Sequence, residues 1–232
     1  MASKSKLVLF DIDGTLVLDN GAARESFRIA LEDVYDYSGD LSVYDFSGRT
    51  DPEIALMVLA DSGLSSQMVE PSIARLWERY LRELSSRATT TSVRVLAGVS
   101  ELLSFLSTRD DLVLGLLTGN IEPGARIKLE PHGLNSFFPF GAFGSDSIHR
   151  EKLPPVAISR ASDHCGHQFS GRDVVIIGDS IYDVRCGVPH GATTVAVASG
   201  RTRADALAAE NPDLLIDSLQ EVDRILKVLD DQ

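Results

Sequence analysis

The sequence predicts an α/β fold: a doubly wound, mostly parallel sheet of Rossmann-like type with an inserted α-helical domain. Short apolar runs without alternation are typical of strands that are buried on both faces of such a sheet. They occur at residues 7–10, 112–117, 174–177, 193–198 and 214–216, and the run at 140–143 fits less well. From residue 95 onward these runs alternate with helix-like stretches at 99–108, 124–132, 155–165, 181–188 and 203–210. That alternation indicates βα units, whose right-handed crossovers place helices on both faces of the sheet.

Residues 19–90 follow a different pattern, which predicts the inserted domain. Apolar residues have helical spacing at 22–35, 52–61 and 67–87, and no buried-strand run interrupts these stretches. A chain of 232 residues is long enough for one domain with a substantial insert. We therefore expect an α/β core formed by residues 1–18 and 91–232, and a helical cap formed by residues 19–90.

The composition excludes several classes of protein. Apolar residues make up 44% and charged residues 24% of the chain, as in ordinary globular proteins, which excludes wholesale disorder. The net charge of −12 argues against nucleic acids and anionic membranes as partners. Two cysteines are too few for a disulfide scaffold, and the apolar run Leu7–Phe10 is shorter than the roughly 7 to 15 residues of a signal peptide. We expect a soluble, cytoplasmic protein without a membrane span, and its oligomeric state stays open.

Polar residues follow three of the predicted strands. Ligands of open α/β sheets bind beyond the carboxyl ends of the strands, so these positions are the candidate site. The residues that follow residues 7–10, 112–117 and 174–177 are, in that order, Asp11 and Asp13; Thr118, Gly119 and Asn120; and Asp179 and Asp183. Carboxylates that converge from separate strands suit Mg²⁺, which prefers oxygen ligands.

The same residue types suit phosphoryl transfer. A carboxylate such as Asp11 can act as a nucleophile and form an aspartyl-phosphate. A second carboxyl group two residues later, Asp13, can protonate the leaving group and then activate water. The hydroxyl of Thr118 and the free amides of Gly119 and Asn120 form an oxygen-binding corner that suits a phosphate group.

These motifs resemble those of the haloacid dehalogenase superfamily. The resemblance is carried by the pattern Asp11-x-Asp13-Gly14-Thr15-Leu16, by Thr118 after a strand, by a lysine, and by Gly178-Asp179-x-x-x-Asp183. It covers nearly the whole chain and is closest to the phosphoglycolate phosphatase-like branch, in which a helical cap separates the first two motifs. The resemblance implies an α/β core with a helical cap.

The resemblance also implies roles for individual residues. Asp11 would be the nucleophile and a Mg²⁺ ligand, and Asp13 would be the general acid and base, with its backbone carbonyl on the metal. Thr118, with the amides beside it, would bind the transferring phosphoryl group. Asp179 would complete the metal site, with Asp183 in support.

Two basic residues complete the implied site. Lys152, 27 positions before Asp179, is the best match to the lysine of the family, although proline more often follows that lysine directly. Arg49 lies in a cap segment that contacts substrate in this branch, and we expect it to bind an anionic part of the substrate. Asp51 is a good N-cap for the helix that follows. Gly119 departs from the family pattern, in which asparagine often follows the threonine directly.

The expected function is that of a Mg²⁺-dependent phosphatase. The substrate would be a small phosphate monoester, phosphoglycolate-like or a sugar phosphate, hydrolysed through an aspartyl-phosphate. The dehalogenases of the superfamily lack the second acid, so Asp13 favours phosphoryl transfer. Two alternatives stay open: a phosphomutase, which shares these residues, and a non-enzymatic binding protein on an inherited fold.

Overall fold

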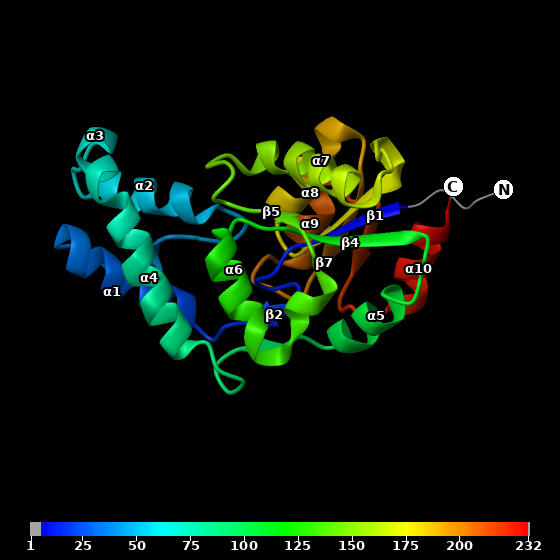
Figure 1. Cartoon of the computed structure of the whole chain (residues 1–232), viewed down its shortest axis with the longest axis horizontal. Helices are drawn as coiled ribbons and strands as arrows, with labels where there is room; N and C mark the ends of the chain where they lie inside the picture. Colours follow the sequence, from blue (N-terminus) through cyan, green and yellow to red (C-terminus); the bar gives the residue numbers. More distant parts are fainter. Residues whose placement is uncertain (1–5, 232) are drawn as a thin grey trace.

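A six-stranded parallel sheet forms the centre of the larger part of the molecule (Figure 1). The computed structural model describes residues 6–231. Every neighbouring pair of strands in this sheet is parallel. The strands lie in the order β5 (Gly141–Ala142), β4 (Leu112–Leu117), β1 (Lys6–Phe10), β6 (Val174–Gly178), β7 (Thr193–Val197) and β8 (Leu214–Ile216). The fold class predicted from the apolar runs is therefore confirmed.

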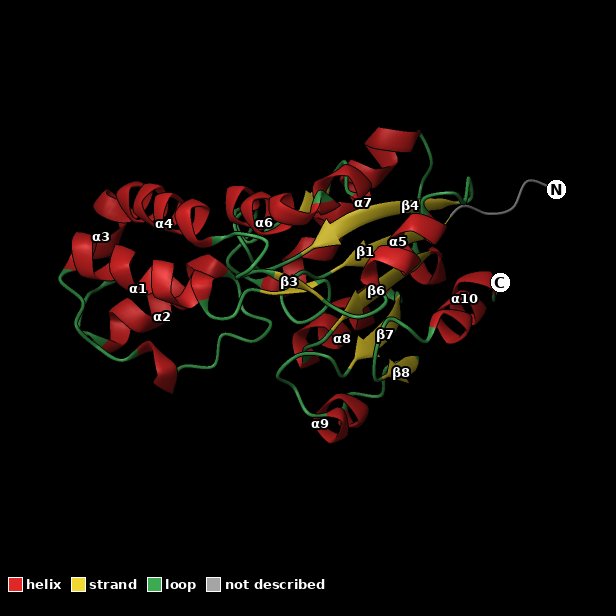
Figure 2. Ribbon diagram, turned by 90° about the horizontal axis from the view of Figure 1, so that it is seen from below, coloured by secondary structure: helices red, strands yellow, loops and turns green. Residues whose placement is uncertain are grey.

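Helices cover both faces of this sheet, as Figure 2 shows. Alternate side chains of β1 point to opposite faces: Val8 and Phe10 belong to one apolar cluster, and Leu7 and Leu9 to another. The first cluster includes side chains from α5 (Val99–Leu106), α6 (Glu122–Leu129) and α10 (Val222–Asp230). The second includes side chains from α7 (Leu153–Cys165) and α8 (Ile181–Gly187), while α9 (Ala204–Ala209) packs near β7. The helix α10 was absent from the sequence prediction.

The inserted helices lie beyond the carboxyl ends of the strands, at the left of Figure 1. They are α1 (Ala22–Tyr35), α2 (Asp51–Asp61), α3 (Ser66–Val69) and α4 (Ile73–Arg87). Their buried side chains, among them Phe27, Leu76 and Tyr80, form an apolar cluster that also includes Ile121 from the core. The single helix predicted for residues 67–87 is interrupted by a 3₁₀ turn, because Pro71 has no N–H group to donate.

Two short strands join the insert to the core. β2 (Val17–Leu18) and β3 (Arg94–Val95) pair in antiparallel fashion, so the chain leaves for the helices and returns from them at one place. Strands of two residues leave no periodic pattern in a sequence, so neither was predicted. The division of the chain at residues 18 and 91 stays a prediction. No helix in residues 6–231 is long and apolar enough to cross a bilayer.

Candidate active site

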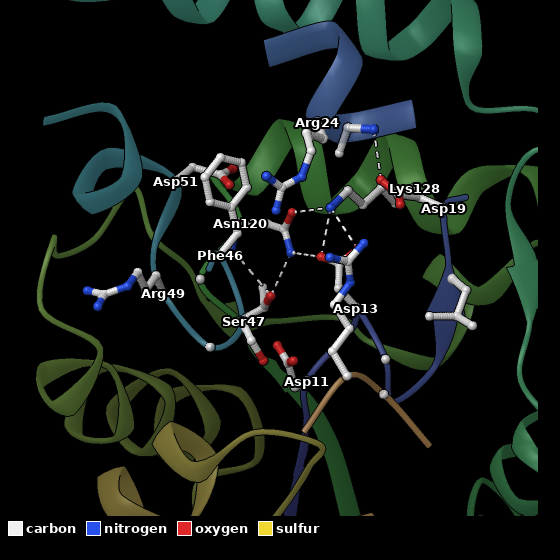
Figure 3. Close-up of a pocket in the computed structure, with 18 of the residues that line it drawn as sticks. Asp11, Asp13, Asp19, Arg24, Phe46, Ser47, Arg49, Asp51, Asn120 and Lys128 are labelled. Carbon is white, nitrogen blue, oxygen red and sulfur yellow. Dashed lines mark hydrogen bonds and ion pairs between the residues drawn. The ribbon is translucent and has the colours of Figure 1, made fainter. Parts of the chain in front are cut away.

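A cavity of about 500 Å³ lies between the carboxyl edge of the sheet and the inserted helices. Its floor is formed by residues that directly follow β1, β4 and β6, including Asp11, Asp13, Thr118 and Asp179. The close-up in Figure 3 shows Asp11 and Asp13 from the core facing residues of the cap across this space. The structure thus brings together the polar residues that follow the three predicted strands.

Three acids gather on this floor. Single carboxylate oxygens of Asp11, Asp179 and Asp183 all lie within 4.8 Å of one another, and the three side chains are buried. Burial raises the pKa of Asp11 to about 6, and the neighbouring charges of Asp183 and Asp13 act in the same direction against the opposing effect of Arg150. Burial, followed by the charges of Asp11 and Asp183, also raises the pKa of Asp179 well above its usual value. A buried cluster of hard oxygen donors that repel one another can hold a metal ion.

A buried arginine lies against this acid cluster. The Nη2 atom of Arg150 is 3.2 Å from Oδ1 of Asp11 and forms an ion pair with Asp183. The guanidinium also donates to the carbonyls of Leu117, at 3.3 Å, and Gly48, at 3.2 Å. Arg150 is 4% exposed, so it brings a permanent positive charge into the interior beside the predicted nucleophile.

Asp183 is held by donors from the protein on both of its oxygens. Its Oδ1 accepts from Arg150, and its Oδ2 accepts from the backbone N–H of Ser180 at 2.9 Å and from the Ser180 hydroxyl at 2.6 Å. The Ser180 side chain in turn accepts from the N–H of Asp183, which completes a capping box at the start of α8. Asp183 therefore fixes Arg150 and the start of a helix in addition to facing the other acids.

The structure does not bring Lys152 to this site. Lys152 is exposed, lies at the end of the 3₁₀ turn Arg150–Lys152, and is not among the residues that line the cavity. The spacing to Asp179 could not decide between Arg150 and Lys152, which are only two positions apart. One feature of the sequence argued against Lys152: Leu153, rather than the proline of the family pattern, follows it directly. The cation beside Asp11 is Arg150.

A second buried cation holds Asp13. The Nζ atom of Lys128 lies 2.8 and 2.7 Å from the two carboxylate oxygens of Asp13 and 2.7 Å from Oδ1 of Asn120. The amide nitrogen of Asn120 donates to Oδ2 of Asp13 at 2.7 Å and to the hydroxyl oxygen of Thr118 at 2.8 Å. Burial lowers the pKa of Lys128. The charges of Asp13 and of other nearby acids raise it by more than burial lowers it, so the ammonium stays protonated.

Sequence reasoning missed Lys128, although a signal was present. Lys128 lies on α6 between Ala125 and Leu129, and all three are buried. A charge on the apolar face of an amphipathic helix has a partner in the interior, because an unpaired buried charge is costly. The partner is Asp13, 115 positions away in the sequence, and this separation hid the pair.

The cap segment before α2 is bonded to the loop after β4. The backbone N–H of Asp51 donates to the carbonyl of Gly119 at 2.8 Å, and Oδ2 of Asp51 accepts from the N–H of Ile121 at 2.9 Å. The N-cap of α2 is Thr50, whose hydroxyl accepts from the N–H of Glu53 at 3.2 Å. The expectation that Asp51 is the N-cap was wrong, because the Asp51 carboxylate faces the neighbouring loop instead.

Gly119 and Arg49 meet in this contact. A Cβ atom on Gly119 would lie 2.0 Å from the carbonyl oxygen of Arg49, so only glycine permits this approach. The Arg49 side chain forms an ion pair with Glu53, and its guanidinium lies 5.7 Å from the ring centroid of Tyr182. Figure 3 shows that this guanidinium points away from Asp11. Arg49 lines the cavity, but its charge is already paired with that of Glu53 in α2.

The fold and the site together define a class of protein: a parallel α/β core with a buried acid directly after its central strand, an acid cluster beside it, and a helical insert above both. Within this class, the chain belongs to the haloacid dehalogenase-like hydrolases, whose family model matches residues 8–197. The predicted family is confirmed, and so is the prediction of a hydrolase.

Individual relatives agree with this assignment. The chain is 24% identical over 226 residues to the phosphoglycolate phosphatase of Vibrio parahaemolyticus, with 96% of each chain covered. It is 28% identical to the phosphoglycolate phosphatase of Pseudomonas savastanoi, over 94% of this chain and 78% of the relative. The crystal structure of CbbY from Rhodobacter sphaeroides in complex with phosphate shares the fold, with a TM-score of 0.75 and 19% identity over 94% of this chain and 96% of that one. The predicted likeness to the phosphoglycolate phosphatase branch is therefore confirmed.

Proposed function

We propose that the protein is a metal-dependent phosphatase that hydrolyses a small phosphate monoester through an aspartyl-phosphate on Asp11. The observation that carries this proposal is that Asp11 and Asp13 line one cavity, with Asp11 in a cluster of acids that can hold a metal ion. Asp11 is buried beside an acid cluster and Arg150, whereas the side chain of Asp13 is 41% exposed and is held by Lys128. The names of the relatives, phosphoglycolate phosphatases, support the same activity.

The metal of this proposal is Mg²⁺. The carboxylates of Asp11 and Asp179 and the backbone carbonyl of Asp13 would hold it, with Asp183 in support, because both oxygens of Asp183 already accept hydrogen bonds. These oxygen donors fit the ion, and its positive charge, when bound, offsets the repulsion between the phosphoryl oxygens and the acid cluster.

Asp11 and Asp13 act in both half-reactions, Asp11 as nucleophile and leaving group and Asp13 as acid and then as base. In the first, a carboxylate oxygen of Asp11 forms a bond to phosphorus as the ester P–O bond breaks, and the leaving oxygen takes a proton from Asp13. In the second, Asp13 takes a proton from water as the water oxygen attacks phosphorus. The bond from phosphorus to Asp11 then breaks, which releases phosphate and restores the carboxylate.

The residues around these two acids bind and orient the phosphoryl group. The hydroxyl of Thr118 and the backbone amides of Gly119 and Asn120 provide donors on the side of β4. Arg150 supplies the cation that the family places beside the nucleophile, the role expected of Lys152 from the sequence. The Asn120 side chain, bonded to both Thr118 and Asp13, keeps the oxygen-binding corner aligned with the acid.

The test is phosphate release from a panel of small phosphate monoesters that includes phosphoglycolate and sugar phosphates. Wild type is assayed with Mg²⁺ and with a chelator, beside Asp11→Asn and the control Asp163→Asn, which alters an exposed acid of α7. We expect release to require the metal, and Asp11→Asn to lower kcat about 10⁴-fold or more, as for other essential groups. Activity of Asp11→Asn within tenfold of wild type would overturn the assignment of the nucleophile, and isomerised products in place of phosphate would favour a phosphomutase.

A further inference from the structure

Two arginines line the cavity but take no part in the reaction proposed above. Arg24 extends from α1 of the cap, and Arg201 lies in the loop that follows β7 of the core. Within residues 6–231, neither guanidinium forms an ion pair with a carboxylate. This distinguishes both from Arg49, whose charge is paired with Glu53.

Arg24 is fixed in place by uncharged groups. Its guanidinium donates to the backbone carbonyls of Leu41 and Tyr44, the latter at 3.2 Å, and lies 3.9 Å from the ring centroid of Phe46. Figure 3 shows the Arg24 side chain descending from the cap, with its guanidinium beside Phe46. A guanidinium has five N–H donors, so this arrangement orients Arg24 and leaves donors for a ligand.

The backbone that carries Arg201 is held against the acid cluster. The hydroxyl of Ser199 donates to the carbonyl of Gly14 at 2.7 Å. A Cβ atom on Gly200 would lie 1.7 Å from Oδ2 of Asp179, so glycine alone lets the chain pass beside this acid. Arg201 follows immediately and is exposed at the edge of the cavity. Its position is therefore set by close packing of the two preceding residues.

The two guanidinium groups carry like charges and line the same cavity. Burial lowers the pKa of Arg24, and the charge of Arg201 lowers it further. The acids that face Arg24 are Asp45, Asp19 and Asp40, none of which forms an ion pair with it. The oxygens of Asp19 accept from backbone N–H groups of Gly21, at 3.0 Å, and of Ala23, at 2.7 Å, and Oδ1 of Asp40 accepts from the N–H of Ser42 at 2.7 Å. An anion that binds both guanidiniums would relieve their repulsion.

We propose that Arg24 and Arg201 form a second anion-binding subsite, which binds a carboxylate or phosphate group on the leaving part of the substrate. The inference rests on the proposed function and narrows its substrate class to phosphate monoesters that carry a second anionic group. One guanidinium comes from the cap and the other from the core, so such a substrate contacts both parts of the molecule. We therefore assign to Arg24 and Arg201 the binding of an anionic part of the substrate, which the sequence had predicted for Arg49.

The first test compares esters that differ only in the second anion. Phosphoglycolate carries a carboxylate, ethane-1,2-diol bisphosphate carries a phosphate, and ethyl phosphate carries neither. We expect Arg201→Gln to lower kcat/KM for one of the first two about tenfold to a hundredfold more than for ethyl phosphate, the range for a lost hydrogen bond between charged groups. Whichever of the two loses more identifies the anion. The control Arg203→Gln removes an exposed arginine that pairs with Asp205, and it should leave kcat/KM for all three esters unchanged.

A binding measurement separates this inference from the proposed function. Asp11→Asn with Mg²⁺ is titrated calorimetrically with phosphonoacetate, with ethane-1,2-bisphosphonate and with ethylphosphonate, with and without Arg201→Gln or Arg24→Gln. We expect either arginine substitution to raise the Kd of phosphonoacetate or of the bisphosphonate about tenfold or more relative to the Kd of ethylphosphonate. An equal change in the Kd of all three ligands would overturn the subsite, even if wild type hydrolyses esters. A selective loss would uphold it even if wild type releases no phosphate, in which case only the proposed function fails.

Discussion

Replacement of Arg150 by methionine tests the electrostatic organisation of the site. The substitution keeps a long side chain but removes the cation that lies 3.2 Å from Asp11 and pairs with Asp183. Two buried acids then face each other without a counter-charge, and the carbonyls of Leu117 and Gly48 each lose a donor. The control is Lys152→Met, which makes the same chemical change two residues away on an exposed side chain.

The size of the effect follows from burial. Loss of one partner of a buried ion pair costs about 3 to 5 kcal/mol, which at about 2 to 4 °C for each kcal/mol in a chain of this size lowers the Tm by about 6 to 20 °C. Lys152→Met should stay within about 0.5 kcal/mol of wild type, as surface substitutions do. Arg150→Lys should fall between the two, because one ammonium cannot contact both carboxylates and both carbonyls.

Urea denaturation followed by circular dichroism in the presence of a chelator measures these free energies, and phosphate release with Mg²⁺ measures activity. We expect Arg150→Met to lower kcat about 10² to 10³-fold, the range for removal of one group that stabilises charge in the transition state. A double-mutant cycle with Asp183→Asn should give a coupling of about 0.5 to 3 kcal/mol. If Arg150→Met is as stable as wild type, or if Lys152→Met is the more damaging substitution, the argument from burial is refuted.

Two further predictions concern titration and reactivity. The pKa of Asp11 is raised to about 6 by burial, so in the absence of metal its ionisation lowers the free energy of unfolding as pH rises from about 4 to about 6. The Asp11→Asn variant should therefore lose less stability over this interval than wild type in urea titrations, and an equal or greater loss would contradict the assignment. Burial raises the pKa of Cys186 to about 12, whereas Cys165 is exposed. Iodoacetamide at pH 8 should modify Cys165 alone in the native protein, and modification of both residues, detected by mass spectrometry, would show that Cys186 is accessible.

The strands were predictable because the sheet is buried on both faces. A run such as Val174–Ile177 has no polar residue, and this pattern survives in the sequence whatever surrounds the strand. The acids were predictable for a related reason, since Asp11 directly follows β1 and Asp179 directly follows β6. Helix α10 was missed although its apolar residues have helical spacing. The pair β2 and β3 was not predictable, because each strand has two residues and is held by a segment distant in the sequence.

The basic residues were harder to assign than the acids. Arg150 and Lys152 are separated by one residue in a turn, and only the tertiary packing decides which one is buried. Lys128 acquires its role from Asp13, with which it shares no local pattern. Spacing along the chain locates a functional segment, but which side chain of a turn enters a cavity depends on the neighbours that surround it in space.

The pairing of β2 with β3 has a consequence for how such a protein can diversify. Val17 lies opposite Val95, so the ends of a long excursion of the chain are held at a fixed, short separation that belongs to the core. The entropy of closing such an excursion rises only slowly with its length. The intervening segment can therefore lengthen, shorten or be exchanged without disturbing the register between β1 and β4. In this arrangement the cap side of the cavity can change in evolution while the core residues that follow β1, β4 and β6 stay in place.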